Sequence, residues 1–365
     1  MREKLGPTGA TMGLSDTNGG LSGSCGTLRW GVLGAARTAR KRTLPAMLRA
    51  GQKVVALAGR SEGHLAGFKE EFGIDLTYHW DQVGSFLQNP TIDAVYIALP
   101  SALHAEWTVR SLEAGKHVLC EKPIATCRSE IDKIVSVALQ TKRIVQENFS
   151  YNLTPGYRYL EKIRPAGVIS LLKSVDIRYS FLATWEHRVR YDRMLGGGSF
   201  MDLGCYGVDF IHRYLSERIH VLEVDAMPPP PSQLFWGSGP DHPVDVEAKL
   251  SGRTESGVRI SITTSFVEEA RQSVELCMAN GDLFVIPRAF RVENDTSEIV
   301  HCVSGGRISR ENFAVFDTDL EMLMMFEGQV SRSTPMDELQ IHRWRSDADV
   351  LEEVQALILG KVDRR

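Results

Sequence analysis

Short apolar runs alternate with amphipathic segments between residues 29 and 147, and this alternation restricts the fold more than any other feature of the chain. Such runs are typical of buried strands, and the segments between them have helical periodicity. Together they predict a doubly wound parallel sheet, the Rossmann arrangement. The expected strands are Arg29–Leu33, Lys53–Ala58, Ala94–Ala98, His117–Cys120 and Ile144–Glu147. The expected helices are Arg40–Ala50, His64–Phe72, Ala105–Ala114 and Ser129–Gln140.

The pattern changes after Tyr151, where strands follow one another without intervening helices. This arrangement favours an α+β domain with a large, mostly antiparallel sheet. One helix is expected at Pro155–Ile163 and a closing one at Val350–Leu359, with strands at Ser174–Phe181, Val244–Ser251, Val258–Phe266, Gln272–Ala279 and Gly281–Val285. Because 365 residues suffice for two cores, we expect a disordered tail over 1–27, a Rossmann domain over 28–150 and an α+β domain over 151–365.

The composition argues against several classes of protein. A formal net charge of −4 gives no long-range attraction to phosphate backbones, which disfavours nucleic acid as a partner. The chain has no apolar run of about 18 residues, so no membrane span is expected. Its six cysteines form no Cys-x-x-Cys pair, and no metal site is expected. Scattered thiols and the lack of a secretory signal favour the cytoplasm.

The turn after the first strand has the spacing of a dinucleotide fingerprint. Gly34, Ala36 and Ala39 occupy the three small positions of G-x-G-x-x-G/A, with alanine in place of the second glycine. Small residues there allow a tight turn, close approach of the pyrophosphate and packing of helix on strand. A generic strand-turn-helix corner is the alternative. We expect the cofactor to contact Gly34, Ala35, Ala36, Arg37 and Thr38.

The end of the second strand carries Arg60 and Ser61 instead of an acidic residue. A guanidinium and a hydroxyl suit a 2′-phosphate, so NADP(H) is favoured over NAD(H), although a solvated surface arginine would give the same sequence. Further cofactor contacts are expected where the next strands end, because open α/β sheets bind ligands at the carboxyl ends of their strands. These residues are Leu99, Pro100, Leu103, His104, Glu121 and Lys122.

A second polar motif lies in the other half of the chain. Gly196, Gly197 and Gly198 permit a tight turn before a helix on which Asp202 and Tyr206 are four residues apart. This spacing places the carboxylate and the phenol on one face of the helix. The alternative is a buried, hydrogen-bonded Asp/Tyr pair without a catalytic role.

Four runs together resemble the Gfo/Idh/MocA oxidoreductases, and the resemblance is strong over about residues 28–215. The runs are Gly31–Ala39, Asp93–Pro100 followed by His104, Ala114–Pro123 with its Glu-Lys-Pro, and Gly196–Tyr206. The Asp-x-x-x-Tyr form resembles sugar 3-ketoreductases, glucose-fructose oxidoreductase, and the dihydrodiol and xylose dehydrogenases. The inositol dehydrogenase branch usually has histidine where this chain has Tyr206.

The resemblance implies catalytic roles for Lys122, Asp202 and Tyr206. Tyr206 would supply the proton or take it back, Lys122 would hydrogen-bond the reacting hydroxyl and lower the pKa of the phenol, and Asp202 would orient the sugar. The roles of Lys122 and Tyr206 could be exchanged. The expected substrate-binding residues are Arg190, Tyr191, Asn148 and Asp202.

The expected activity is NADP(H)-dependent hydride transfer at a sugar carbonyl or hydroxyl. A ketoreductase of a nucleotide-linked keto-deoxysugar, acting at C3, is the leading hypothesis, and a free-sugar (xylose or glucose) or trans-dihydrodiol dehydrogenase is the alternative. A non-catalytic NADP sensor of the same fold and a purely structural protein are further alternatives, which retention of Lys122, Asp202 and Tyr206 disfavours. The resemblance also implies a homodimer or homotetramer, formed through the second domain.

Overall fold

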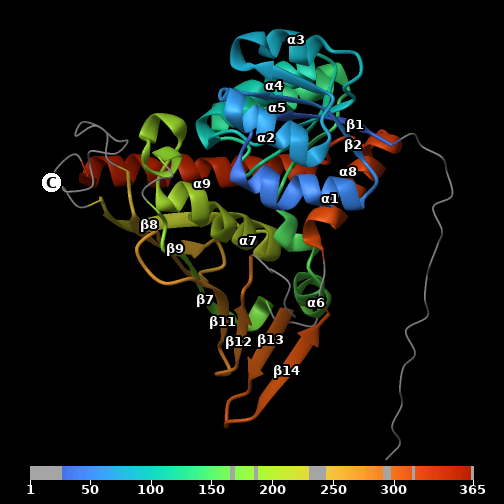
Figure 1. Ribbon diagram of the computed structural model, residues 1–365. Helices are drawn as coiled ribbons and strands as arrows, with labels where there is room; N and C mark the ends of the chain where they lie inside the picture. The colour runs from blue at the N-terminus through green and yellow to red at the C-terminus, as the bar shows by residue number, and fades with distance from the viewer. Residues whose placement is uncertain are drawn as a thin grey trace, which may run out of the picture.

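The computed structural model describes residues 27–164, 169–184, 188–229, 244–290, 297–314 and 317–362. Figure 1 shows an α/β unit with a large twisted sheet below it, and one long helix, α9 (Glu338–Val362), running between them. The tail expected to be disordered lies, except for residue 27, outside the described residues. Among the described residues, no helix combines the length and the apolar character needed to cross a membrane.

The first sheet is parallel, with strand order β3-β2-β1-β4-β5-β6, and confirms the predicted Rossmann arrangement. Its strands are β1 (Arg29–Leu33), β2 (Lys53–Gly59), β3 (Leu76–His79), β4 (Ala94–Ile97), β5 (His117–Cys120) and β6 (Val145–Glu147). The connecting helices are η1 (Ala39–Thr43), α1 (Leu44–Arg49), α2 (Glu62–Phe72), η2 (Trp80–Gln82), α3 (Val83–Gln88), η3 (Ser101–Leu103), α4 (His104–Glu113) and α5 (Arg128–Thr141). The sequence analysis missed β3 and α3, because β3 is a short edge strand without a buried residue.

The second sheet has eight strands in the order β14-β13-β12-β11-β7-β10-β9-β8. Only β7 and β10 are parallel neighbours, so the sheet is mostly antiparallel, as predicted. Its strands are β7 (Leu172–Ser180), β8 (Ile219–Met227), β9 (Glu247–Thr254), β10 (Arg259–Ser265), β11 (Arg271–Met278), β12 (Leu283–Pro287), β13 (Ser297–Cys302) and β14 (Ile308–Phe313). The strands that the sequence analysis missed, β8, β13 and β14, lie at the two edges.

Helices and short turns connect the two sheets and cover one face of the second. They are η4 (Ser150–Leu153), α6 (Pro155–Ile163), η6 (Ile169–Leu171), η7 (Arg188–Tyr191), η8 (Arg193–Leu195), η9 (Phe200–Gly204) and α7 (Cys205–Leu215). Alternate residues of the central strands, such as Val175 and Ile177 of β7, are buried in one core with Phe210 and Ile211 of α7. The sheet therefore holds α7 in place, and α7 begins where the polar motif of the second half lies.

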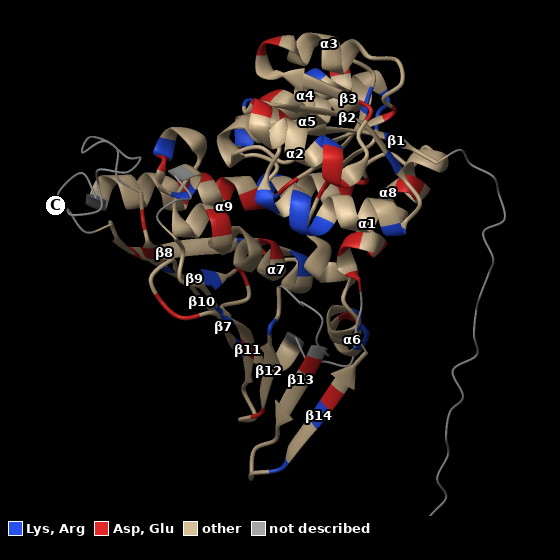
Figure 2. Cartoon of the chain, viewed as in Figure 1, with Lys and Arg blue, Asp and Glu red and all other residues tan. Residues whose placement is uncertain are grey.

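The C-terminal part of the chain returns to the first domain. Phe326 of α8 (Thr318–Ser331) packs against Trp30 of β1 with ring centroids 5.3 Å apart. Basic residues of η1 and α1 face acidic residues at the start of α8 (Figure 2), and Arg42 pairs with Asp319 at 2.8 Å. Helix α9 contacts α5, α7 and β8, and so belongs to the cores of both units. It contains the predicted closing helix and begins much earlier.

Candidate active site

The fingerprint turn lies where β1, β2 and β4 end together. Gly34 has a φ of +107°, and a Cβ on it would clash with the carbonyl oxygen of Ala98. Its amide donates to Ala58 at 2.9 Å, while the amide of Ala98 donates to Leu33 at 2.9 Å. Glycine is therefore required here, and the turn presents Ala35 and the following residues at the carboxyl edge of the sheet. This is the environment that the pattern predicted for a pyrophosphate.

Arg60 and Ser61 lie at the next strand end, exposed to solvent. The Ser61 hydroxyl accepts a hydrogen bond from the amide of His64 at 3.4 Å and caps α2. The ring of His79 lies 2.9 Å from the carbonyl oxygen of Arg60 and fixes the backbone there. Arg60 is thus exposed and directly precedes the Ser61 cap of α2, a position in keeping with a 2′-phosphate site.

The segment from Leu99 to His104 joins the fingerprint turn to the second domain. Gly196, with a φ of +75°, packs so closely that a Cβ would lie 2.8 Å from the amide nitrogen of Ala102. His104, expected to contact the cofactor, is buried, and its two ring nitrogens lie 2.7 Å from the carbonyl oxygens of Leu99 and Pro123. It therefore ties the ends of β4 and β5 together.

Glu121 is the centre of a partly buried chain of hydrogen bonds. Its Oε1 accepts from the hydroxyl of Tyr96 at 2.6 Å and from the amide of Asn148 at 2.8 Å. The hydroxyl of Thr43 lies 2.9 Å from that of Tyr96. The side chain of Asn148, a predicted substrate ligand, is thus held within the protein, although among the described residues its Oδ1 has no hydrogen-bond partner.

Lys122, Asp202 and Arg190 form one ion-paired trio, so the structure brings together residues that lie 80 positions apart. Lys122 Nζ donates to Asp202 Oδ1 at 2.8 Å and to its carbonyl oxygen at 2.7 Å. Arg190 Nε donates to the other carboxylate oxygen at 2.9 Å. Burial by itself would raise the pKa of Asp202, but the two cations outweigh it and hold the pKa below its usual range. Burial likewise acts to lower the pKa of Lys122, and Asp202 reverses the shift to a net increase.

The phenol of Tyr206 lies against this trio. Lys122 Nζ is 4.8 Å from the centre of the Tyr206 ring, and four aromatic rings surround it at centroid distances of 5.3 to 6.0 Å: Phe149, Tyr151, Tyr179 and Phe290. Burial raises the pKa of Tyr206, and although Lys122 acts to lower it, as expected from the sequence, the net shift is upward. Lys122 thus acts on the phenol pKa in the expected direction, but desolvation outweighs the ammonium.

The helix that carries Asp202 and Tyr206 starts with a π-helical turn, η9. Asp245 Oδ2 accepts from the Ser199 hydroxyl at 2.7 Å and from the Phe200 amide at 2.8 Å, which fixes this start. No sequence signal pointed to Asp245, which precedes β9 and follows a stretch outside the described residues. Tyr191, expected to contact substrate, is buried and packs against Phe266 at 5.9 Å.

The comparison with protein families decides the classification. Residues 28–149 match the model described as an oxidoreductase family with an NAD-binding Rossmann fold, and residues 157–284 match the GFO/IDH/MocA C-terminal domain. The chain belongs to the Gfo/Idh/MocA family. It is an oxidoreductase of this family, as its motifs indicated.

Curated relatives include sugar-modifying enzymes. The chain is 27% identical over 312 residues to a dTDP-3,4-didehydro-2,6-dideoxy-alpha-D-glucose 3-reductase of Saccharopolyspora spinosa, covering 85% of this chain and 90% of that one. It is 28% identical over 295 residues to a D-xylose 1-dehydrogenase (NADP(+)) of Haloferax volcanii, covering 80% and 85%. A solved 3-ketoreductase of Actinomadura kijaniata, in complex with NADP and TDP-benzene, matches with a TM-score of 0.81 at 23% identity over 91% of this chain and 98% of that one. This last likeness shows the shared fold.

Proposed function

We propose that this protein is an NADP(H)-dependent reductase that converts the C3 carbonyl of a nucleotide-linked keto-deoxysugar to a hydroxyl. The ion-paired trio of Lys122, Asp202 and Arg190 against the Tyr206 ring carries the proposal. It places an ammonium and a phenol together at the carboxyl end of a dinucleotide-binding sheet. Reduction of a carbonyl needs such a proton donor and such a positive charge.

The cofactor would be held at the Gly34 turn and at Arg60. The absence of a side chain at Gly34 fits the close approach of a pyrophosphate, and the exposed Arg60 beside the N-terminus of α2 fits a 2′-phosphate. When bound, NADPH supplies the hydride. The hydrogen bond from Asn148 to Glu121 fixes the side chain of the residue that precedes Lys122.

Tyr206 is the proton donor to the carbonyl oxygen in this proposal. Its raised pKa keeps the phenol protonated, which suits reduction, and no hydrogen bond to its hydroxyl is found among the described residues. Lys122 uses two of its three N–H donors on Asp202, so one remains for the same oxygen. Asp202 keeps Lys122 charged, and Arg190 holds Asp202 from the other side.

The substrate assignment follows the 3-reductase to which the chain is similar over most of its length. The dehydrogenase alternative, oxidation of a free sugar such as xylose or of a diol, is favoured by the comparable similarity to the xylose dehydrogenase. The two differ in one requirement. A nucleotide-sugar enzyme must bind a nucleoside diphosphate, whereas a free-sugar enzyme has no such need.

The deciding experiment follows NADPH and NADH oxidation by absorbance with a panel of nucleotide-linked keto-sugars, free aldoses and diketones, together with the reverse reaction on xylose, glucose and a diol. We expect turnover on one nucleotide-linked sugar with NADPH. Turnover confined to free sugars or diols would replace the proposal with the dehydrogenase. Tight NADPH binding without turnover on any of them would favour a sensor. Light scattering tests the homodimer or homotetramer that we also propose.

A further inference from the structure

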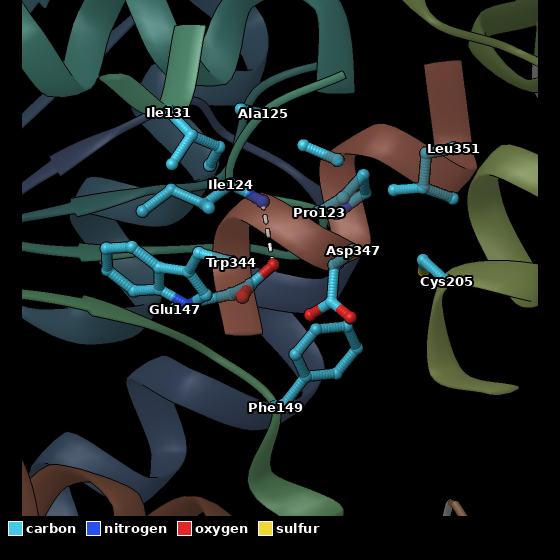
Figure 3. A pocket seen from close by; sticks show the side chains of 11 residues that line it. Pro123, Ile124, Ala125, Ile131, Glu147, Phe149, Cys205, Trp344, Asp347 and Leu351 are labelled. Carbon is cyan, nitrogen blue, oxygen red and sulfur yellow. Dashed lines mark hydrogen bonds between the residues drawn. The ribbon is translucent and has the colours of Figure 1, made fainter. Parts of the chain in front are cut away.

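A small cavity lies beside Pro123 and Ile124, the two residues that follow Lys122 in the chain. Its volume is about 10 Å³, which is room for one water molecule. Pro123, Phe149, Cys205 and Trp344 line it, and two carboxyl groups, those of Glu147 and Asp347, face it (Figure 3). Carboxyl groups are rarely buried in a cavity without a nearby countercharge or a hydrogen bond.

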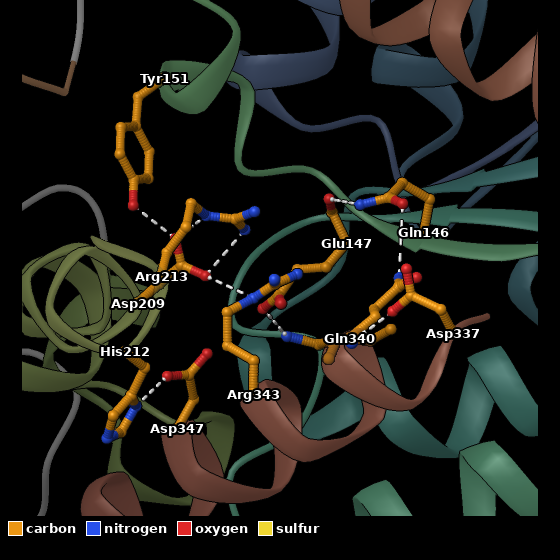
Figure 4. A network of polar contacts seen from close by, with 11 residues as sticks. Gln146, Glu147, Tyr151, Asp209, His212, Arg213, Asp337, Gln340, Arg343 and Asp347 are labelled. Atoms are coloured by element: carbon orange, nitrogen blue, oxygen red, sulfur yellow. Dashed lines mark hydrogen bonds and ion pairs between the residues drawn. The ribbon is translucent and has the colours of Figure 1, made fainter. Parts of the chain in front are cut away.

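Glu147, the last residue of β6, is 4% exposed, and its carboxyl Oε1 accepts a hydrogen bond from the amide of Ile124 at 2.8 Å. Desolvation raises its pKa to about 8, with Asp209 and Asp347 adding to the shift and the hydrogen bond from Ile124 and the charge of Arg343 opposing it. The titratable and charged groups on the elements around it are Cys205, Asp209, His212, Arg213, Arg343, Asp347 and Tyr151 (Figure 4).

Asp347, on α9, brings the second carboxyl group to the cavity. Its Oδ1 lies 2.6 Å from Nδ1 of His212 on α7. Its Oδ2 is buried and has no hydrogen-bond partner among the described residues. An acceptor of this kind and an acid on Glu147 are suitable partners for one bridging water, which needs at least two polar neighbours.

The chain around Lys122 is fixed at the two residues that follow it. The carbonyl oxygen of Pro123 lies 2.7 Å from Nδ1 of His104, and the amide of Ile124 donates to Glu147. These contacts come from two different elements, α4 and β6. The ammonium of Lys122 therefore depends for its position on a backbone segment that Glu147 holds.

We propose that Glu147 is a positioning residue for Lys122, held as a neutral carboxylic acid that shares one water in this cavity with Asp347. The link to turnover rests on the proposed function, whereas the neutral acid and the fixed backbone do not. A neutral acid satisfies the Ile124 amide and donates toward Asp347 without adding a third buried negative charge beside Asp209 and Asp347.

Infrared difference spectra test the neutral acid without substrate or cofactor. Near neutral pH, wild type minus Glu147→Gln should contain the carbonyl stretch of a protonated carboxylic acid, and the band should disappear as the pH rises through about 8. Glu130→Gln is the matched control, because Glu130 accepts from the amide of Thr126 at 2.8 Å outside the cavity. Absence of the band would overturn the proposal.

Thermal unfolding gives a second measure of the same proton. Because the folded pKa of Glu147, about 8, lies above its ordinary 4.5, the folded state binds the extra proton and stability contributed by this group falls as the pH rises across that window. Glu147→Gln removes this titration. The Tm of the variant minus that of wild type should therefore increase as the pH is raised from 5 toward about 8. A difference in Tm that does not change with pH would contradict a neutral acid.

Positioning is tested by hydrogen exchange and by turnover. Glu147→Ala should speed amide exchange in the peptide containing Ile124 and lower kcat about tenfold or more, with NADPH affinity within about twofold of wild type. Glu147→Gln, which can still accept from Ile124, should restore both and remove any loss of kcat near pH 8. Wild-type exchange in Glu147→Ala would overturn the positioning role. If exchange and infrared agree but no substrate turns over, the proposed function has failed instead.

Discussion

Helix α7 and the turn before it carry two carboxylates, each held between two cations, and the two sites differ mainly in solvent exposure. Asp202 lies between Lys122 and Arg190 with 27% of its side chain exposed. Asp209 lies between Arg213 and Arg343 with 0% exposed, and it also accepts from the hydroxyl of Tyr151 at 2.5 Å. The Asp202 site, called the open site below, keeps one unused N–H donor on Lys122 for a ligand. The contacts of the Asp209 site, called the sealed site, instead join α7, η4 and α9 (Figure 4).

The two ion-paired carboxylates should therefore differ in role, one supporting stability and the other turnover. A sealed charge must remain paired because water cannot replace a lost partner, so its removal should appear in stability. A half-open charge can be solvated when a partner is lost, so its removal should appear mainly in turnover.

The largest effect is expected for Asp209→Asn, which removes a fully buried anion and leaves both Arg213 and Arg343, largely enclosed side chains 17% and 18% exposed, without it. Breaking such a buried group costs about 3–5 kcal/mol. Urea unfolding should measure a loss of this size, and Asp202→Asn should lose much less stability while turning over more slowly. Equal losses of stability in the two variants would remove the distinction between the sites.

Next in size are Tyr206→Phe and Lys122→Ala, which should each lower kcat by about two orders of magnitude with NADPH binding nearly intact, the effect expected of an acid-base group. Tyr157→Phe is a matched control, since the hydroxyl of Tyr157 is buried and has no hydrogen-bond partner among the described residues. Turnover and NADPH fluorescence titration check both. Unchanged turnover in Tyr206→Phe and Lys122→Ala would reject the mechanism.

Local patterns were enough to predict five of the six strands of the first sheet and to single out the residues that meet at the open site. Gly34, Lys122 and Asp202 lie in short motifs whose spacing reflects the backbone itself, and the Rossmann strands are continuous buried runs. The sealed site depends on contacts across long stretches of chain. Arg343 pairs with Asp209 because α9 runs back between the two sheets. No local pattern around either residue indicates this ion pair.

The same reasoning explains two features that local patterns could not indicate. The pKa of Tyr206 depends on burial among four aromatic rings that come from three separate segments, so the motif could indicate the neighbouring ammonium but not the burial that outweighs it. The edge strands β3 and β14 have little or no buried side of their own, so their periodicity is weak.

Asp319 sharpens the comparison because the exposed fraction of its side chain lies between those of Asp202 and Asp209. It pairs with Arg42 at 2.8 Å, with 13% of its side chain exposed and 19% of that of Arg42. Asp319→Asn should therefore cost about 1–2 kcal/mol, less than Asp209→Asn, because it removes the anion from one arginine instead of two and because the Asp319 carboxylate is itself partly solvated. Urea unfolding of the two variants in the same buffer measures the order. A loss as large as that of Asp209→Asn would mean that exposure does not govern these pairs.

Arg60 extends the comparison to an exposed charge, whose substitution should have the smallest effect on stability of the changes considered. Its side chain faces solvent at the end of β2, so Arg60→Asp should leave the Tm nearly unchanged. If Arg60 binds the 2′-phosphate, the change places a carboxylate against it and should lower the NADPH to NADH preference about tenfold or more. Arg253→Asp, at an exposed position of β9, controls for the change in net charge. An unaltered cofactor ratio in Arg60→Asp would show that this arginine is a solvated surface charge, and the 2′-phosphate would then have to be bound elsewhere along the carboxyl edge of the sheet.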